Sequence, residues 1–456
     1  MDKLNKSATA NDLETIQSSR KSASKIRLSI EESQTKIGSN RDRYGFKKKS
    51  NFVSELEYND WWVDYSKHCA RRKKKWETLM IKSGLSLDND NPERFPARSE
   101  KLKRYIRKGI PAEWRGNAWW YFAKGQDKLN SNKGLYDKLV ESTVNMHNKD
   151  TEIIERDLNR TFPDNIHFRP ERTSSTVTPE TPLIQALRRV LVAFATYQPS
   201  IGYCQSLNFI VGLLLIFMDE EKAFWMLVII TSKYLPGVHE INLEGVNIDQ
   251  GVLMLTIKEY LPETWQKIIS INFDDSIDPN SEHYDFLVKL PPVTLCTSSW
   301  FMSAFIGILP IETTLRVWDC FFYEESSFFF KTSLSIFKLL EPRLIVHHDE
   351  MEVFQIIQNA PKSIIDPSTL FDLIFKKKHG FNNLTQEDIN RCRKFVGERR
   401  QKYKESSDIN DANFNRGLLN ESLWQPDVYG FKKGLPGVHW NKNLTRRMRN
   451  LRKKPT

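Results

Sequence analysis

The most informative polar residues of this chain are an arginine and a glutamine, each set in a short polar stretch beside an apolar segment. Arg160 lies in IERDLNRTFP, and Gln205 lies in IGYCQSLNF. A guanidinium is always charged and presents a fork of donors that matches phosphate oxygens. An amide both donates and accepts hydrogen bonds, so it can hold a water molecule in place. Together the two side chains suit phosphoryl transfer, in which charge must be stabilised and the attacking water aimed.

The size of the effect makes this chemistry worth considering. An arginine placed on the transferred phosphate is worth roughly 10³ to 10⁵ in rate, on the order of 4 to 7 kcal/mol. The chain has no G-x-x-x-x-G-K-[ST] loop with which to hold a nucleotide of its own. The arginine and the glutamine are therefore expected to complete a site on another protein.

Taken alone, each residue also has an ordinary structural interpretation. Arg160 follows Asp157 by three positions, and such pairs on a helix are most often exposed contacts worth a few tenths of a kcal/mol. Gln205 precedes an apolar stretch, where a polar residue commonly caps or begins a helix. Only the joint pattern favours a role in chemistry.

Three motifs in this order resemble the signature of the TBC domain, the family of GTPase-activating proteins for Rab GTPases. The matching residues are Arg115 and Trp119 for R-x-x-x-W, Ile154, Asp157, Arg160 and Thr161 for I-x-x-D-x-x-R-T, and Tyr203 and Gln205 for Y-x-Q. Later segments, among them LPETWQ and Ser298 to Phe322, resemble the second half of the family. The likeness covers roughly residues 104 to 345. The sequences of the motifs are most similar to those of fungal members that act on secretory and endosomal Rabs.

The resemblance implies that Arg160 is an arginine finger and that Gln205 is a glutamine finger replacing the switch glutamine of the Rab. Asp157 would orient Arg160, and Tyr203 would set the loop that carries Gln205. The remaining supporting residues are Arg115, Trp119, Thr161 and Asn208. The implied fold is all-helical and V-shaped, with two lobes and both fingers on the first. The implied partner is a Rab in its GTP form, which brings GTP and Mg²⁺ with it, so the chain itself needs no cofactor.

One position departs from the family pattern. Many members read Q-G-M-N where this chain reads Gln205, Ser206, Leu207 and Asn208. A serine in place of the glycine matters if the backbone there needs a positive φ. A second hypothesis is therefore a TBC-fold scaffold that binds a Rab with little effect on hydrolysis. Inactive members typically lack one finger, whereas this chain keeps both.

Arg115 and Trp119 favour a structural role. They lie one helical turn apart, so their side chains can meet on one face of a helix. A cation stacked on an indole would brace the fold. We therefore expect Arg115 to support the first lobe.

No metal site is predicted, because the adjacent residues His347 to Glu350 would point in different directions from a helix.

The elements that must position these residues are helical. Strand-like alternation is scarce, and Pro182 to Tyr197 shows the 3.6-residue apolar period of a core helix. Two polar stretches, Phe168 to Thr181 and Asn272 to His283, are predicted loops. We divide the chain into a disordered polar tail (1–50), a helical extension with an amphipathic helix from Phe52 to Leu79 (51–100), the TBC domain (101–345), a second helical extension (346–405) and a mostly irregular segment with a basic tail (406–456).

Composition favours a cytoplasmic protein. The five cysteines are scattered without metal-ligand spacing, which favours reduced thiols, and neither a signal peptide nor a membrane-spanning run is expected. The net charge of +11 is concentrated in the tails and in Arg71 to Lys75, and no nucleic-acid recognition motif accompanies it. The basic stretch Lys442 to Lys454 has two interpretations of equal weight, contact with an anionic membrane or a solvated tail. The resemblance to fungal members of the TBC family implies peripheral membrane association at sites of polarised growth and a role in vesicle trafficking and exocytosis.

Overall fold

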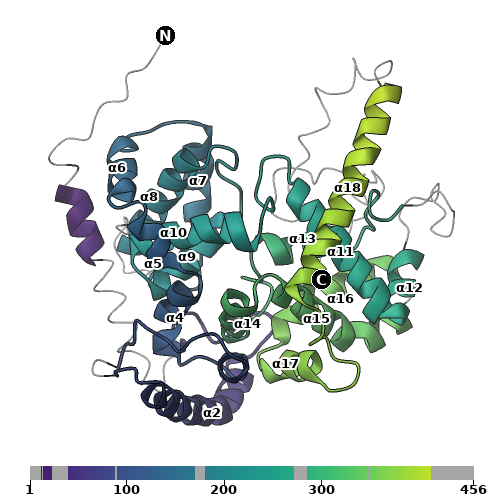
Figure 1. The fold of residues 1–456 in the computed structure, drawn as a ribbon, viewed down its shortest axis with the longest axis horizontal. Helices are drawn as coiled ribbons and strands as arrows, with labels where there is room; N and C mark the ends of the chain where they lie inside the picture. The colour runs from purple at the N-terminus through teal and green to yellow at the C-terminus, as the bar shows by residue number, and fades with distance from the viewer. Residues whose placement is uncertain are drawn as a thin grey trace, which may run out of the picture. The chain divides into compact units, whose positions relative to one another are not determined.

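The computed structural model describes residues 12, 14–22, 40–87, 90–169, 180–271, 285–347 and 349–411, with side chains as far as residue 405. Every regular element in these ranges is a helix, which confirms the all-helical prediction (Figure 1). The chain divides into two compact units. The first comprises Met1–Pro236 and Leu309–Glu325, and the second comprises Gly237–Ile308 and Ser326–Thr456. The V-shaped arrangement of two lobes stays a prediction.

The first unit is built around three apolar helices that pack on one another, α8, α9 and α10. Its helices are α2 (Glu55–Lys82), α3 (Glu100–Arg107), η2 (Ala112–Trp114), α4 (Arg115–Phe122), α5 (Gly125–Asn130), α6 (Leu135–Ser142), α7 (Lys149–Leu158), α8 (Pro182–Tyr197), α9 (Leu207–Phe217), α10 (Glu220–Ile229), η3 (Ile230–Tyr234) and α14 (Ile311–Glu324). The helix α8 has the predicted bounds, because Thr181 caps it and Pro182 suits its first turn.

The amphipathic helix predicted from Phe52 to Leu79 is α2. It begins at a capping box formed by Ser54 and Glu57. Its buried Trp76 donates a hydrogen bond from Nε1 to the carbonyl oxygen of Gly109, at 2.8 Å. This contact fixes α2 against the segment that follows α3.

The predicted boundary of the N-terminal tail at residue 50 is placed too late. Residues 14–22 are helical, and Arg20 forms an ion pair with Asp137 on α6, at 2.7 Å. Residues 40–50 also belong to the folded unit, since Tyr44 is 2% exposed and its carbonyl oxygen accepts from Asn165 Nδ2 at 2.9 Å. Polar composition misled the prediction, because Tyr44 and Arg43 anchor this stretch through contacts with Asn165 and Glu312.

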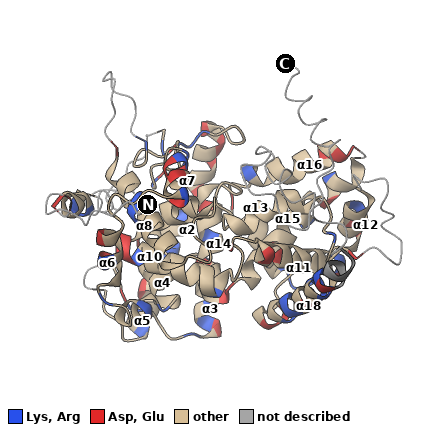
Figure 2. Cartoon of the chain, turned by 90° about the horizontal axis from the view of Figure 1, so that it is seen from above, with Lys and Arg blue, Asp and Glu red and all other residues tan. Residues whose placement is uncertain are grey.

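The second unit is centred on α11, which contacts α12, α13, α15 and α18. Its helices are α11 (Glu244–Tyr260), α12 (Pro262–Ser270), α13 (Thr294–Met302), α15 (Ser327–Val346), α16 (Glu350–Asn359), η4 (Ala360–Ser363), α17 (Ser368–Phe375) and α18 (Gln386–Asp411). Both signs of charge occur along α18 (Figure 2). Arg393 and Arg400 of α18 pair with Asp249 and Glu244 of α11, at 2.6 and 2.7 Å. The predicted division at residue 345 therefore does not separate an extension from this unit.

Several predictions fall outside the described residues. They concern 170–179 in the first predicted loop, 272–284 around the second, and the basic tail at 442–454. Within the described ranges, no helix combines the length and the apolar character needed to cross a bilayer.

Candidate functional site

Arg160 lies just beyond the C-terminal end of α7. The start of this helix is fixed by reciprocal hydrogen bonds between Asn148 and Thr151, at 2.8 and 2.9 Å. Its end is closed by the backbone N–H of Arg160, which donates to the carbonyl oxygen of Asp157 at 3.1 Å. The Arg160 side chain is 45% exposed, so its guanidinium is accessible to another molecule.

Asp157 is the buried carboxylate that joins the second and third motifs. It is 1% exposed, and its Oδ1 accepts a hydrogen bond from Nη2 of Arg160. Its Oδ2 accepts from the hydroxyl of Tyr203 at 2.7 Å. Burial, together with the charge of Asp157, raises the pKa of Tyr203 well above its ordinary value, so the hydroxyl remains a donor. A carboxylate held in this way restricts the directions in which the Arg160 guanidinium can point.

Gln205 lies in the turn that leads into α9, and its side chain is half-buried. The adjacent backbone N–H of Ser206 donates to Oδ1 of Asn208 at 3.2 Å. Nδ2 of Asn208 in turn donates to Oγ1 of Thr161 at 2.8 Å, and Thr161 Oγ1 donates to the carbonyl oxygen of Asp157 at 2.8 Å. Asn208 and Thr161 therefore connect the turn of the glutamine to the turn of the arginine.

Two glycines allow these turns to approach their neighbours closely. A Cβ atom on Gly212 of α9 would lie 2.9 Å from Cε2 of Phe162 and 3.0 Å from Cγ2 of Thr161. A Cβ atom on Gly202, whose φ is +58°, would lie 2.9 Å from Oδ2 of Asp150. The close approach of α9 to the turn that carries Arg160 thus depends on the absence of a side chain at Gly212.

Ser206 occupies a backbone conformation that favours glycine, with φ of +103°. This is the position where the sequence departs from the family pattern. We predict that Ser206→Gly raises the free energy of unfolding by about 0.5 to 1 kcal/mol, because relief of left-handed strain exceeds the greater freedom of glycine in the unfolded chain. Urea denaturation of the variant beside the wild type measures this difference. Ser206→Val should have the opposite sign, and an unchanged or less stable glycine variant would contradict the assignment of strain.

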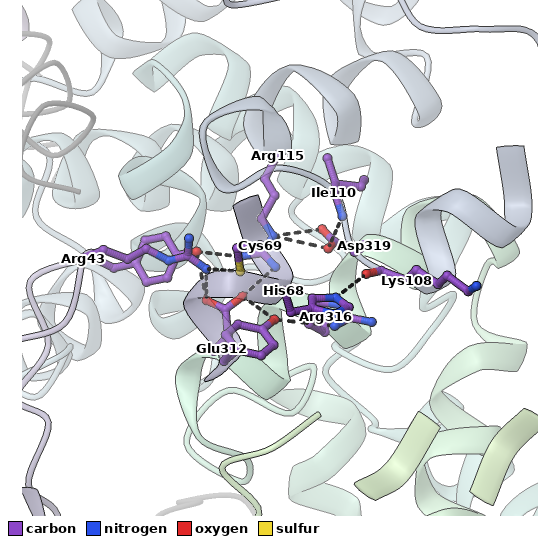
Figure 3. Close-up of polar contacts among 12 residues, drawn as sticks. Arg43, His68, Cys69, Lys108, Ile110, Arg115, Glu312, Arg316 and Asp319 are labelled. Atoms are coloured by element: carbon purple, nitrogen blue, oxygen red, sulfur yellow. Dashed lines mark hydrogen bonds and ion pairs between the residues drawn. The ribbon is translucent and has the colours of Figure 1, made fainter. Parts of the chain in front are cut away.

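Arg115 belongs to a separate, buried network in the first unit (Figure 3). Trp119 joins the same network through Asp319. Arg115 is 1% exposed, and its Nε donates to Oδ1 of Asp319 at 3.2 Å. Trp119 Nε1 donates to the same oxygen at 3.0 Å. The two side chains therefore meet through a shared carboxylate, rather than by the predicted stacking of cation on indole. This geometry supports a structural role for the first motif.

Glu312 is the second carboxylate of this network. It accepts hydrogen bonds from Arg115, Arg43 and the hydroxyl of Tyr65, at 2.9, 2.8 and 3.0 Å. Burial alone would raise its pKa, but Arg115 and Arg43 hold the pKa of Glu312 well below its ordinary range. At Asp319 burial dominates and raises the pKa. Sequence reasoning missed both carboxylates, although acidic residues within the otherwise apolar α14 were a usable signal.

No group of three or more histidine, cysteine, aspartate or glutamate side chains in the described part of the chain is arranged to hold a metal ion. The pattern at His347 to Glu350 is only partly described, since His348 lies outside the described residues. His347 Nδ1 lies 2.8 Å from a carboxylate oxygen of Glu352.

The fold and the site together define an all-helical protein that holds an arginine and a glutamine on two connected turns. A sequence model of the Rab-GTPase-TBC domain matches residues 112–345. The chain belongs to this family, which confirms the resemblance and gives the protein a GTPase-activating role toward Rabs.

Two relatives and one solved structure show how far the similarity extends. The chain is 51% identical to GTPase-activating protein GYP3 of Saccharomyces cerevisiae, over 91% of this chain and 75% of the relative. It is 49% identical to GTPase-activating protein MSB4 of the same organism, over 81% of this chain and 83% of the relative. The crystal structure of the Chlamydomonas flagellar RabGAP TBC domain is similar in fold, with a TM-score of 0.56 and 24% identity, over 73% of this chain and 98% of that one.

Proposed function

We propose that this protein accelerates GTP hydrolysis by a Rab GTPase through Arg160 and Gln205, which it supplies in trans. The observation that carries the proposal is the buried Asp157, which orients the half-exposed Arg160. Asn208 meanwhile connects the Gln205 turn to Thr161. Groups held in place before the reaction stabilise developing charge without reorganising during it. Phosphoryl transfer depends mainly on such positioning and electrostatics.

In this proposal the chemistry is divided between two proteins. The Rab carries GTP and Mg²⁺, and this chain provides neither a nucleotide site nor a cofactor. The names of the two yeast relatives support the activating role.

We place the protein in the cytoplasm, peripherally associated with membranes at sites of polarised growth, where it regulates vesicle trafficking and exocytosis. The basic tail would contact the membrane, and no nucleic acid is among the proposed partners.

The experiment that tests the function is phosphate release from a panel of GTP-loaded Rabs with catalytic amounts of the full chain. We expect acceleration on one or a few Rabs. If the chain bound a Rab and accelerated none, the alternative of a catalytically weak TBC-fold scaffold would replace this proposal. Ser206, whose serine departs from the family pattern, is the position that would then be examined first.

For Gln205→Ala we predict a loss of stimulated hydrolysis of about a hundredfold, comparable with that of an arginine finger. The reason is that the amide is expected to aim the attacking water. A Rab whose own switch glutamine is replaced should still respond to the wild-type protein. Phosphate release measures both effects, with Gln355→Ala as the control, since Gln355 is exposed on α16 of the second unit. An unresponsive mutant Rab would show that the glutamine is not supplied in trans.

A further inference from the structure

We infer a binding site for a phosphate-bearing anion on the first unit, where α2 meets the C-terminal end of α3. The site is formed by His68, Arg71 and Arg72, and it is separate from the turns that carry Arg160 and Gln205. The site is independent of the proposed function. The contacts of one buried arginine carry the inference.

Arg72 is a buried cation without a counter-charge. It is 7% exposed, its Nη2 donates to the carbonyl oxygen of Tyr105 at 2.9 Å, and its guanidinium lies 4.9 Å from the centre of the Tyr105 ring. Its Nε has no hydrogen-bond partner, and no carboxylate of the described residues pairs with it. A buried charge is normally paired, because desolvation is costly without compensation. Arg72 therefore carries a charge that no carboxylate balances and that a bound anion would balance.

The carboxylates of the neighbouring network are already used by other arginines. Glu312 accepts from Arg43 and Arg115, and Asp319 accepts from Arg115 (Figure 3). Arg316 lies on the same side of the network as His68, and its Nη2 donates to the carbonyl oxygen of Arg107 at 2.8 Å. Burial and the like charge of Arg316 lower the pKa of Arg72 to about 10. The protein thus places cations together here without an acidic residue to balance Arg72.

The flanking residues of α2 extend this positive region to the surface. His68, Arg71, Arg72 and Lys75 lie on one side of the helix, since they are spaced by three, four and seven positions. Arg71 and Lys75 are exposed, and His68 Nε2 lies 3.1 Å from the carbonyl oxygen of Lys108. Burial and three neighbouring cations, Arg316, Arg72 and Arg71, lower the pKa of His68. A bound anion should raise the pKa of His68, because it offsets the effect of the neighbouring cations.

The chemistry of the site favours a phosphate group. Guanidinium groups bind phosphate oxygens with paired, charge-assisted hydrogen bonds, and Arg71 and Arg72 lie three and four positions after His68, one helical turn away. Such a group can come from the headgroup of a phosphorylated inositol lipid or from a soluble phosphate compound. Both sources present the same anionic oxygens to Arg71 and Arg72.

The test uses the full chain and measures binding of inorganic phosphate and of inositol hexakisphosphate by calorimetry, together with the pKa of His68 by NMR. We expect the anion to raise the pKa of His68. Arg72→Gln should increase the dissociation constant at least about tenfold, since the change removes the charge that the anion balances. Lys138→Gln on α6 removes the same charge from an exposed residue elsewhere in the first unit and should leave the dissociation constant unchanged.

Vesicles distinguish the two sources. Binding to vesicles with a phosphorylated inositol lipid, but not to phosphatidylserine vesicles of equal charge, would identify a headgroup, provided that Arg72→Gln abolishes it. Binding of the soluble anions alone, with the same loss in Arg72→Gln, would identify a soluble ligand. Equal affinities of Arg72→Gln and Lys138→Gln, or an unmoved pKa of His68 in the wild type, would overturn the proposal. If Arg72→Gln does not fold, Arg71→Gln decides, and wild-type affinity in that variant would also overturn it.

Discussion

Replacement of Arg160 by alanine is expected to reduce the stimulated hydrolysis of GTP by a Rab by at least about a hundredfold. An arginine finger contributes roughly 10³ to 10⁵ in rate, and no other residue of the described turn offers a guanidinium held by a buried carboxylate. Arg160→Lys should lose nearly as much activity, because an ammonium group lacks the planar fork. Single-turnover phosphate release at saturating activator measures the chemical step separately from binding.

A matched control lies on α7, the helix that precedes Arg160. Arg156 is one turn before Arg160, and its side chain is 59% exposed beside Glu152, at 4.0 Å. Arg156→Ala removes an equal charge from α7, and we expect activity within about twofold of the wild type, since exposed pairs contribute little. Near-normal activity of Arg160→Ala, with a fold and a Rab affinity like those of the wild type, would end the assignment of the finger.

The largest expected effect on stability is that of Arg115→Ala. The change leaves Glu312 and Asp319 buried with one fewer cation, and breaking a buried ion pair in this way costs about 3 to 5 kcal/mol. Arg115→Lys keeps the charge but loses part of the hydrogen bonding, so it should be intermediate. Urea denaturation monitored by tryptophan fluorescence measures the free energy of unfolding.

Arg188 provides the comparison for this prediction. Its partly exposed side chain pairs with Glu155 and Glu180, at 2.5 and 2.6 Å. Arg188→Ala should cost no more than about 1 kcal/mol, because exposed ion pairs are screened by water and salt. Losses of equal size in the Arg115 and Arg188 variants would show that the buried network is not a major source of stability.

The family and the helical class were predictable from the sequence because they depend on local signals. The apolar period of Pro182 to Tyr197 defined α8, and the capping residues around Ser54 lie close to the predicted start of α2. The motifs that contain Arg160 and Gln205 are also short and contiguous. Such patterns act over a few residues, so they can be recognised without knowledge of the partners that each side chain meets.

The contacts between distant segments were not predictable in the same way. Tyr44, in a stretch that appears disordered by composition, donates a hydrogen bond to Glu312 at 3.1 Å. Arg393 contacts Asp249 across a long separation in sequence, which joins α18 to α11. Neither pairing has a periodic or local signature, because the two partners are brought together only when the chain folds.

At the candidate site the residue types were set by the sequence, whereas their arrangement was decided by the tertiary structure. The motifs place Asp157, Arg160, Tyr203 and Gln205 in this order along the chain. Only the fold placed Tyr203 on Asp157 and Asn208 on Thr161, so that two turns distant in the chain form one connected site. The physical reason is that residue identity is local, whereas hydrogen-bond geometry and burial depend on the close packing of α7, α8 and α9.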